Sequence, residues 1–574
     1  RIHGVRLLGP NCIGIIDTHF PFDTSFLQPP MPPKGGIAFV SQSGALCAAV
    51  VDWSRGQGFG FSKIVSLGNQ ADIDEAEILA GISEDHKTRV IALYMEGVAD
   101  GKSFMQEAGE VARNKPIVAM KVGRSEPGRK AVSSHTAALA GSDAAFEAAF
   151  AKCGILRAAT AEQLFDWARA LEQCPLPAGR RVAILTDAGG PGVMAADALE
   201  AEGMQLAALG PTTRQALAAG LPAAASAGNP VDMLASASPR DYARCLSLLL
   251  DADEVDSVLV ILPPPPMYTA ESVAEEIIPI IQAARKPVTV ALLGSHLTAM
   301  ARDAFLRAQI PTYPFPERAA SSLAVLARRA QFVSTPPMAA VTRPFEAGTI
   351  AASGAEHLLR AYGIRVQDLR LAISADSAAA IAVEIGFPVV LKIASPDIIH
   401  KSDIGGIMLD IRDPAAAAAG YRQLMESVHA RMPQANLEGV HIQGHISEGQ
   451  EVIIGGIRDP QFGPLVMFGS GGIEAEALRD VAFALAPLGP AEADGLMERT
   501  WAGRRLAGFR GMAPVDRAAA LDALVRLSWL MHEHSELLQI EINPLRVTQE
   551  GAIALDVRSS QAPPAGRPAQ PRMV

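Results

Sequence analysis

Alternation between strand-like and helix-like segments is the strongest constraint in this sequence of 574 residues. Between residues 35 and 174, short runs rich in β-branched residues, such as GIAFV at 36–40, are followed by longer segments with helical spacing of apolar residues. This alternation predicts βαβ units, in which parallel strands form a sheet and helices cover its faces. The pattern restarts with RVAILTD at 181–187, so the sequence predicts two doubly wound units.

A different pattern follows a proline-containing linker near residues 334–348. Helical segments there flank mixed antiparallel strands, of which GVHIQGHI at 439–446 and QEVIIGGIRD at 450–459 are expected to pair with each other. This mixture predicts an α+β domain that clamps a nucleotide. The tail is rich in Pro and Ala, and we expect it to be disordered. The predicted domains span 35–174, 178–333 and 345–560, followed by the tail at 561–574.

The composition argues against several classes of protein. A formal net charge of −11 leaves no broad basic field, which argues against nucleic acid as a partner. The five cysteines are scattered and form no CxxC pair, which argues against a disulfide framework or a zinc site and favours a cytoplasmic protein. No run of about 18 apolar residues is present, so the sequence predicts no membrane segment.

Two glycine-containing loops occur where a strand is expected to give way to a helix. SQSGAL at 41–46 and DAGGPG at 187–192 each put small residues ahead of a helix. The start of a helix offers free N–H groups and a partial positive charge to an anion, although such turns are also common without a ligand. The candidate phosphate-binding residues are Ser41, Ser43, Gly44, Gly189, Gly190 and Gly192.

His135 lies in a polar stretch, GRKAVSSHTAALAGSD, that follows a strand-like run. Loops in this position line the ligand-binding edge of an open parallel sheet, but a single histidine there can equally cap a helix at the surface. Glu96, at the end of the strand-like run RVIALYME, is its candidate partner. A carboxylate bonded to one imidazole nitrogen leaves the other free as a nucleophile, so the two residues form a candidate catalytic pair.

A second histidine, His400, lies just before Lys401 and a pair of glycines in KIASPDIIHKSDIGG. The glycines permit a mobile loop that could move the histidine, although a solvated loop histidine is the alternative interpretation. Lys392, in the strand-like run VVLKI, would place a positive charge at nucleotide phosphates. The oxygens of Asn543 and Asp556, on two further strand-like runs, suit Mg²⁺ whose coordination is completed by phosphates and water.

The order of these motifs resembles that of the ADP-forming acetyl-CoA synthetases, in the superfamily of succinyl-CoA synthetase. The resemblance spans about residues 7–558 and rests on LLGPNCIG, FVSQSGAL, SSHTAALAGSD, TDAGGPGVMAADAL, LKIASPDIIHKSDIGG, IRDPQFGPLVMFGSGG and EINPL. It implies an α/β fold class: the end of a CoA-binding Rossmann domain at 1–20, two flavodoxin-like doubly wound ligase domains and a C-terminal ATP-grasp domain. Because the glycine-rich loop of the Rossmann domain is missing, we expect a truncated N-terminus.

The resemblance also implies roles for individual residues. His135 resembles the phosphorylated histidine, with Glu96 as its carboxylate partner, and His400 resembles the second histidine that shuttles phosphate to the nucleotide. The two helix starts resemble the pair that holds the phosphate. The remaining positions are Lys392 and Glu451 for the nucleotide, Asn543 and Asp556 for the metal, Glu541 where many members have Asp, and GNPVDM around Asn229 and Asp232 for the acyl substrate.

The implied reaction interconverts a carboxylic acid, coenzyme A and ATP with acyl-CoA, ADP and phosphate. It proceeds through an acyl phosphate and phosphohistidines, with Mg²⁺ at the nucleotide, and relatives that pair fused chains suggest a homodimer. One alternative is a non-catalytic acyl-CoA or nucleotide sensor related to bacterial lysine acetyltransferases, and the retained His135 and His400 argue against it. Another is an ATP-grasp carboxylase or peptide-type ligase, and the two ligase-type units argue against that.

Overall fold

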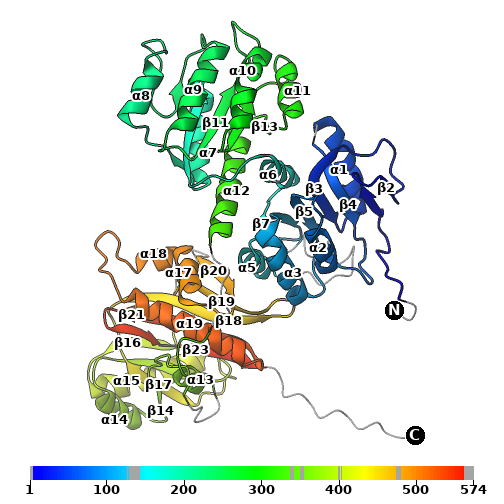
Figure 1. Ribbon diagram of the computed structural model, residues 1–574. Helices are drawn as coiled ribbons and strands as arrows, with labels where there is room; N and C mark the ends of the chain where they lie inside the picture. Colours follow the sequence, from blue (N-terminus) through cyan, green and yellow to red (C-terminus); the bar gives the residue numbers. More distant parts are fainter. Residues whose placement is uncertain are drawn as a thin grey trace, which may run out of the picture. The chain divides into compact units, whose positions relative to one another are not determined.

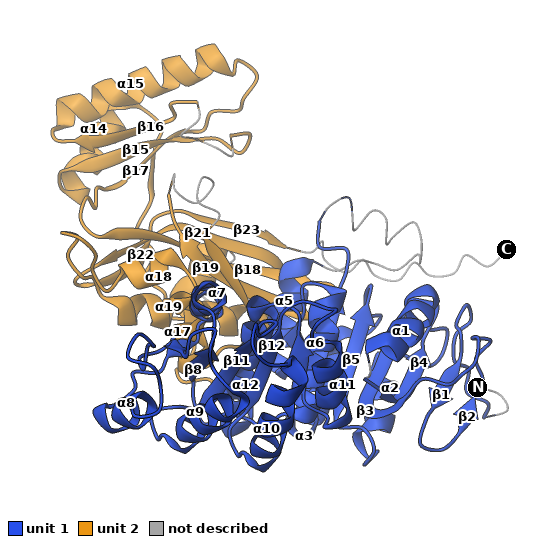
Figure 2. Ribbon diagram, turned by 90° about the horizontal axis from the view of Figure 1, so that it is seen from above, with its two compact units in different colours: residues 1–338 blue, residues 339–574 orange. Residues whose placement is uncertain are grey.

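The computed structural model describes residues 4–57, 59–125, 127, 142–335, 342–348, 354–398, 401, 404–472 and 480–561. The chain divides into two compact units, Arg1–Met338 (unit 1) and Ala339–Val574 (unit 2), which Figure 2 colours separately. Each unit has its own sheets and its own hydrophobic cores.

The first sheet of unit 1 has seven strands in the order β2-β1-β4-β3-β5-β6-β7. Its strands from β4 to β7 are parallel, whereas β1 pairs antiparallel with β2 and β4. Ile37 to Val40 are all buried, as expected for a strand that helices cover on both faces. The strands are β1 (Ile15–Asp17), β2 (Phe22–Asp23), β3 (Lys34–Ser41), β4 (Phe61–Ser66), β5 (Val90–Met95), β6 (Ile117–Lys121) and β7 (Leu156–Arg157).

Helices lie on the faces of this sheet, as Figure 1 shows. Polar side chains fix several of their starts; Thr160, for example, accepts the N–H of Gln163 at the start of α6. The described helices are α1 (Gly44–Gln57), α2 (Glu75–Ser83), α3 (Gly101–Asn114), α5 (Asp143–Cys153) and α6 (Ala161–Gln173).

The second sheet of unit 1 is parallel throughout its described strands, in the order β10-β8-β11-β12-β13, with β9 beside β8. It repeats the doubly wound plan of the first sheet. Its strands are β8 (Arg181–Thr186), β9 (Gln205–Leu206), β10 (Val231–Asp232), β11 (Ser257–Leu262), β12 (Val288–Leu292) and β13 (Thr312–Tyr313). Its helices are α7 (Gly189–Ala201), α8 (Pro211–Ala218), α9 (Pro239–Asp251), α10 (Ala270–Ala283), α11 (Ala299–Arg307) and α12 (Pro316–Ser334).

Helices α6 and α12 join the two halves of unit 1. The Arg318 guanidinium forms a bidentate ion pair with the buried Asp166, at 2.6 and 2.9 Å. The Trp167 indole N–H donates to Ser321 at 3.1 Å. The buried Arg329 guanidinium donates to the carbonyls of Ala112 and Arg113. Directed hydrogen bonds to the buried Asp166 and from the buried Arg329 make this a specific interface rather than a loose contact.

Unit 2 begins with a four-stranded antiparallel sheet in the order β14-β17-β15-β16. Helices α14 and α15 cover one of its faces (Figure 2). The elements are β14 (Arg370–Ala372), α14 (Ala375–Ile385), β15 (Val389–Ala394), β16 (Ile407–Ile411), α15 (Pro414–Arg431) and β17 (Gly439–Gly444).

A second antiparallel sheet completes unit 2, in the order β20-β19-β18-β21-β22 with β23 beside β21. Its core packs against α13, α17, α18 and α19. The elements are α13 (Ala355–Ala361), β18 (Gln450–Asp459), β19 (Gly463–Ser470), β20 (Val481–Leu485), α17 (Pro490–Glu498), α18 (Trp501–Arg505), α19 (Arg517–Glu533), β21 (Leu537–Thr548), β22 (Gly551–Ala554) and β23 (Val557–Gln561).

The mixed α/β architecture agrees with the fold expected from the sequence, including two doubly wound halves and a mixed C-terminal unit. Across the described part of the chain, no helix is both long and apolar enough to cross a membrane.

Candidate functional site

A hydroxyl fixes the turn between β3 and α1. Ser41, the last residue of β3, is fully buried; its hydroxyl donates to the carbonyl of Ser43 at 3.0 Å and accepts the N–H of Ser43 at 3.1 Å. Ser43 then caps α1, because its hydroxyl accepts the N–H of Leu46 at 3.3 Å. A side chain at Gly44 would put a Cβ 3.1 Å from Ile13, so the glycine permits close packing of the helix start. The predicted residues Ser41, Ser43 and Gly44 therefore lie together at one helix N-terminus.

The turn between β8 and α7 is built in the same way. Thr186, also buried at the end of its strand, donates to the carbonyl of Ala188 and accepts its N–H, both at 3.0 Å. Gly189 and Gly190 are exposed at the start of α7, whereas Gly192 is buried against Thr186, where a Cβ would lie 3.3 Å from the threonine methyl group. The first two glycines thus leave the helix start open, and the third allows the helix to pack on its strand.

Glu96 follows β5, and the Gln42 side chain holds its backbone. Gln42 accepts the N–H groups of Glu96 and Gly97, and its amide nitrogen donates to the Gly97 carbonyl at 2.7 Å and to Glu75. The Oε2 atom of Glu96 is buried and has no hydrogen-bond partner among the described residues. His135 lies outside the described residues, so its pairing with Glu96 stays a prediction.

The two helix starts lie in separate halves of unit 1. Figures 1 and 2 both show α6 between α1 and α7. Within the described residues, no hydrogen bond or ion pair joins the loop at 41–46 to the loop at 187–192. One chain therefore does not bring the two predicted phosphate loops into direct contact.

The predicted nucleotide residues gather where the two sheets of unit 2 meet. The buried Lys392, on β15, donates from Nζ to the carbonyl of Leu555 at 3.1 Å. Burial lowers the pKa of Lys392, and the nearby carboxylates of Asp556 and Glu451 oppose that shift. Glu451 forms a 2.6 Å ion pair with Arg546. His400 lies outside the described residues, but the adjacent Lys401 is described.

The candidate metal ligands are also neighbours. The backbone N–H of Asn543 donates to the carbonyl of Asp556 at 3.1 Å, and the Asn543 amide oxygen accepts the N–H of Gly472 at 2.9 Å. An amide oxygen and a carboxylate are hard ligands, and each retains lone pairs, so these residues fit Mg²⁺. Glu541 lies two residues before Asn543 on β21, on the same face of the strand, because Ile540 and Ile542 point into the core.

A hollow of about 210 Å³ lies beside Glu451. Arginines give this hollow positive charge, and its glycines, which have no side chain, leave room for a ligand. It is lined by Gly449, Gln450, Glu451, Gly471, Arg505, Met512 and Arg546.

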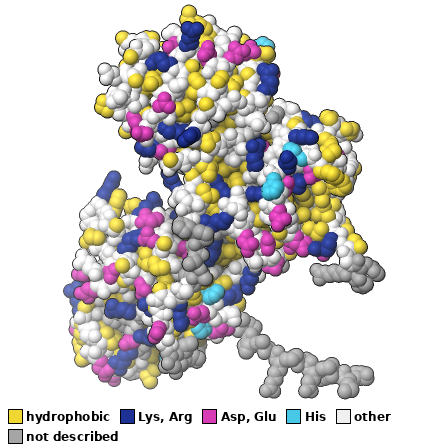
Figure 3. All heavy atoms as spheres, viewed as in Figure 1, with side chains coloured by type: hydrophobic (Ala, Val, Ile, Leu, Met, Phe, Trp, Pro, Cys, Tyr) yellow, Lys and Arg dark blue, Asp and Glu magenta, His cyan; other side chains and the backbone are white. Residues whose placement is uncertain are grey.

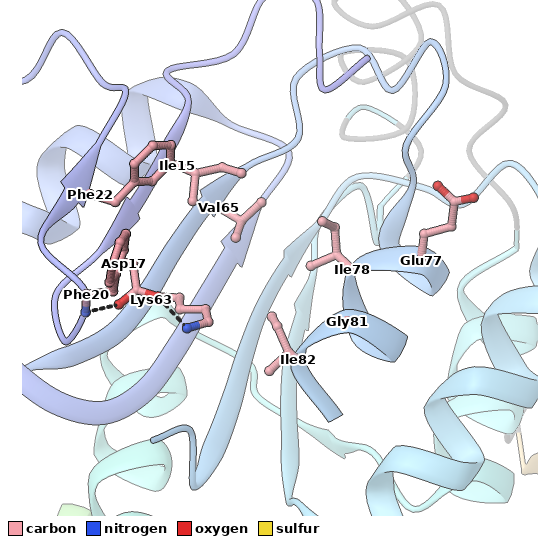
Figure 4. Close-up of a pocket in the computed structure, with 10 residues that line it drawn as sticks. All are labelled: Ile15, Asp17, Phe20, Phe22, Lys63, Val65, Glu77, Ile78, Gly81 and Ile82. Atoms are coloured by element: carbon pink, nitrogen blue, oxygen red, sulfur yellow. Dashed lines mark hydrogen bonds and ion pairs between the residues drawn. The ribbon is translucent and has the colours of Figure 1, made fainter. Parts of the chain in front are cut away.

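A larger hollow, of about 420 Å³, lies at the N-terminal edge of unit 1 between β1, β4 and α2 (Figure 4). Its lining is mainly apolar, with an ion pair between Lys63 and Asp17 at 2.6 Å. Phe20 and Phe22 are exposed beside it, and hydrophobic side chains gather at this edge in Figure 3. None of the predicted site residues lines it.

Three family models match the chain in order. They are described as a succinyl-CoA ligase like flavodoxin domain at 34–171, a ligase-CoA domain at 182–338 and an ATP-grasp domain at 346–560. The acetate–CoA ligase [ADP-forming] I of Archaeoglobus fulgidus is 41% identical over 97% of this chain and 82% of its own length. The chain belongs to the ADP-forming acyl-CoA ligases. Members of this family are ligases, and the fold and enzyme type predicted from the motifs are confirmed.

Other members and solved structures show the same relationship. The 4-hydroxybutyrate–CoA ligase [ADP-forming] of Nitrosopumilus maritimus is 33% identical over 97% of this chain and 82% of its own length. The Ca. Korarchaeum cryptofilum dinucleotide forming acetyl-coenzyme A synthetase 1, in complex with phosphate and ADP, aligns with a TM-score of 0.56. It is 36% identical and covers 58% of this chain and 72% of its own. These relatives give the sensor hypothesis no support.

Some residues of this ligase have roles that sequence reasoning missed. The Asn229 amide, in the motif expected near the acyl substrate, bonds the backbone: it accepts the N–H of Ile184 and donates to the carbonyls of Val182 and Ala207. Its place near an acyl substrate stays a prediction. Gln42 was not singled out, although it stands inside the SQSGAL motif and fixes Glu96. Its polar side chain between two serines was the available signal.

Proposed function

We propose that this chain carries out a reversible phosphoryl relay in which His135 and His400 are phosphorylated in turn. Acyl-CoA and phosphate form an acyl phosphate and free CoA. An imidazole nitrogen of His135 then attacks phosphorus, and the carboxylate of the product acid leaves. His400 next takes the phosphoryl group and delivers it to ADP, which becomes ATP. Each step conserves the phosphoryl group, so the same sequence runs backward to form acyl-CoA.

The carboxylate of Glu96 is the observation that carries this proposal. Its Oε2 atom is buried and unpartnered among the described residues, while Gln42 holds its backbone in place. A buried carboxylate oxygen without a partner is costly, so a protein retains one where a ligand or catalytic group will bond to it. An imidazole N–H from His135 would satisfy Oε2 and leave the other ring nitrogen free to attack phosphorus.

The start of α1 would hold the phosphoryl group while it is attached to His135. Ser41 and Ser43 aim the first turn of the helix, and the N–H groups there stabilise negative charge. No general base is required for attack on phosphorus by a neutral imidazole, so the protein contributes alignment and charge stabilisation.

Unit 2 would supply the nucleotide site. Lys392 would bind phosphate oxygens, and Glu451 would bind a polar group of the nucleotide beside the hollow that it lines. Asn543 and Asp556 would hold Mg²⁺, which supplies charge neutralisation at the phosphates when it is bound. The pair's shared position beside Lys392 supports this assignment.

The relay is tested by labelling the protein with ATP that carries the label on its γ-phosphate. We expect acid-labile, base-stable label on the wild type, none on His400→Ala and less on His135→Ala. His86, an exposed loop residue, provides the control, since His86→Ala should label like the wild type. No label on folded wild-type protein, or full labelling of His400→Ala, contradicts the relay.

We also propose that the ligase acts as a homodimer in which one chain supplies the 41–46 loop and its partner the 187–192 loop. The separation of α1 and α7 within one chain supports this arrangement. Co-expression of His135→Ala with Gly190→Val tests it. A shared site leaves one intact combination in each mixed dimer, so activity should return, whereas a site built within one chain leaves every site defective.

A further inference from the structure

His441 lies opposite Lys392 on neighbouring strands of unit 2. Strands β15 and β17 pair so that Lys392 and His441 face each other directly in the register. Side chains of directly opposed residues project from the same face of a sheet. Val440 and Ile442, on either side of His441, are completely buried in the core on the other face. The imidazole therefore projects on the face that carries the Lys392 ammonium.

The charges around His441 are those of the proposed nucleotide site. The positive charges of Lys401 and Lys392 lower the pKa of His441, whereas the negative charges of Glu438 and Asp556 raise it. Lys401 directly follows His400 in the chain, and Asp556 is a candidate metal ligand. His441 thus belongs to the same charged cluster as Lys392, Lys401 and Asp556.

The ring of His441 is incompletely bonded, and its surroundings disfavour a positive charge on it. Burial, together with the two lysines, lowers the pKa of His441 from its ordinary value. Its Nδ1 atom is buried and lacks a hydrogen-bond partner among the described residues. Lys392 donates to the Leu555 carbonyl, and among the described residues no hydrogen bond joins its ammonium to Nδ1 of His441. A group that arrives from outside the described residues would satisfy that nitrogen.

We propose that His441 is a further phosphate-contacting residue, whose Nδ1–H donates a hydrogen bond to the phosphoryl group in transit between His400 and the nucleotide. This inference rests on the proposed relay. A neutral donor suits the position because a third cation beside Lys392 and Lys401 would be repelled by them. The imidazole adds directionality at the moving phosphoryl group, while the two lysines supply the charge.

Single-turnover phosphorylation of His400 by Mg-ATP tests the inference, together with the dissociation constant for ADP. We expect His441→Ala to phosphorylate about 10- to 100-fold more slowly than the wild type, with ADP affinity changed by less than about 3-fold, because the contact forms to the transferring group. His441→Asn should recover most of the rate, because its amide nitrogen stands near the position of Nδ1. His429→Ala, an exposed position on α15, serves as the control.

The outcomes separate this inference from the relay itself. A wild-type protein that takes no label from ATP contradicts the relay and, with it, the role of His441. If the wild type is labelled and His441→Ala is phosphorylated at the same rate, the role of His441 is overturned but the relay is not. Equal losses of rate and of ADP affinity overturn it as well, since they point to general damage of the nucleotide site. If the alanine variant does not fold, His441→Asn provides the test. A folded Asn variant that takes up no more label than His400→Ala also overturns the role of His441, because the amide donor should recover the rate.

Discussion

The hydroxyl groups of Ser41 and Thr186 make the same pair of contacts at the ends of two different parallel strands. Each is fully buried, and each bonds both the carbonyl and the N–H of the residue two positions later. The next helix, α1 or α7, begins three residues after the hydroxyl. The two halves of unit 1 thus use one device to set the direction of a helix start, and each helix start is a place where an anion is stabilised.

Removal of either hydroxyl should weaken both the fold and the anion site. Ser41→Ala and Thr186→Val each leave the N–H of the turn without its hydroxyl partner, whereas the carbonyl keeps the bond that it accepts from the helix. Each variant should therefore lower the free energy of unfolding by about 1–2 kcal/mol. Urea denaturation measures the change, and Ser295, an exposed residue, gives a control in Ser295→Ala. Unchanged stability in both variants would show that the turn holds its shape without the hydroxyl.

Gln42 should control where the phosphoryl group arrives. Gln42→Met keeps the size of the side chain but removes its bonds to the backbone of Glu96 and Gly97. We expect label on His135 to fall about 10- to 100-fold, because Glu96 loses its alignment, while label on His400 stays near the wild-type value. Digestion of labelled protein and separation of the two histidine peptides measures both.

Gln215→Met, at an exposed position on α8, is the matched control for this experiment. If His135 is labelled equally in Gln42→Met and Gln215→Met, Gln42 is not needed to align Glu96 for the phosphorylation of His135.

The doubly wound halves could be predicted because their information is local. In β3 and β11, continuous apolar runs bounded by turns are buried, and helix patterns follow them. The strands of unit 2 were recognisable for the same reason, since GVHIQGHI and QEVIIGGIRD carry β-branched residues at strand spacing. The expected pairing of these two strands with each other was wrong, because β17 pairs with β14 and β15 whereas β18 pairs with β19 and β21.

Contacts between distant segments could not be predicted from one sequence. The Asn229 amide bonds the backbone of Val182, Ile184 and Ala207, and nothing local to Asn229 encodes that position. His441 is similar: its place in a strand was predictable, but its register opposite Lys392 depends on how β15 and β17 pair. Motifs indicated which residue types carry the chemistry, and tertiary pairing decided which neighbours they meet.

The metal requirement should depend on Asp556. Asp556→Asn keeps the shape of the side chain but removes the negative charge beside Lys392 and Asn543. We expect the Mg²⁺ concentration at half-maximal labelling of His400 to rise at least about 10-fold. Asp368→Asn is the control, because that side chain is 85% exposed. An unchanged Mg²⁺ dependence in the Asp556 variant would exclude this carboxylate as a ligand.

Asp187 lies between Thr186, whose hydroxyl fixes the turn, and the start of α7, and it is only 4% exposed. Burial raises the pKa of Asp187 to about 6, and the nearby Asp232 carboxylate acts in the same direction. The ordinary pKa of an aspartate is 3.8. Between these two values the folded chain retains a proton that the unfolded chain has lost. The free energy of unfolding contributed by Asp187 is therefore complete below about pH 4 and is lost as pH rises through about 6.

Asp187→Asn should remove this pH dependence, because asparagine does not titrate and keeps the shape of the side chain. At pH 4.5 the variant and the wild type should differ little, whereas at pH 7.5 the variant should be more stable by up to about 3 kcal/mol, the value of two pKa units. Urea denaturation at the two pH values measures the difference, with Asp251→Asn, an exposed site on α9, as the control. A stability difference that is the same at both pH values would mean that Asp187 is ionised in the folded protein throughout this range, as it would be if a cation outside the described residues neutralised it.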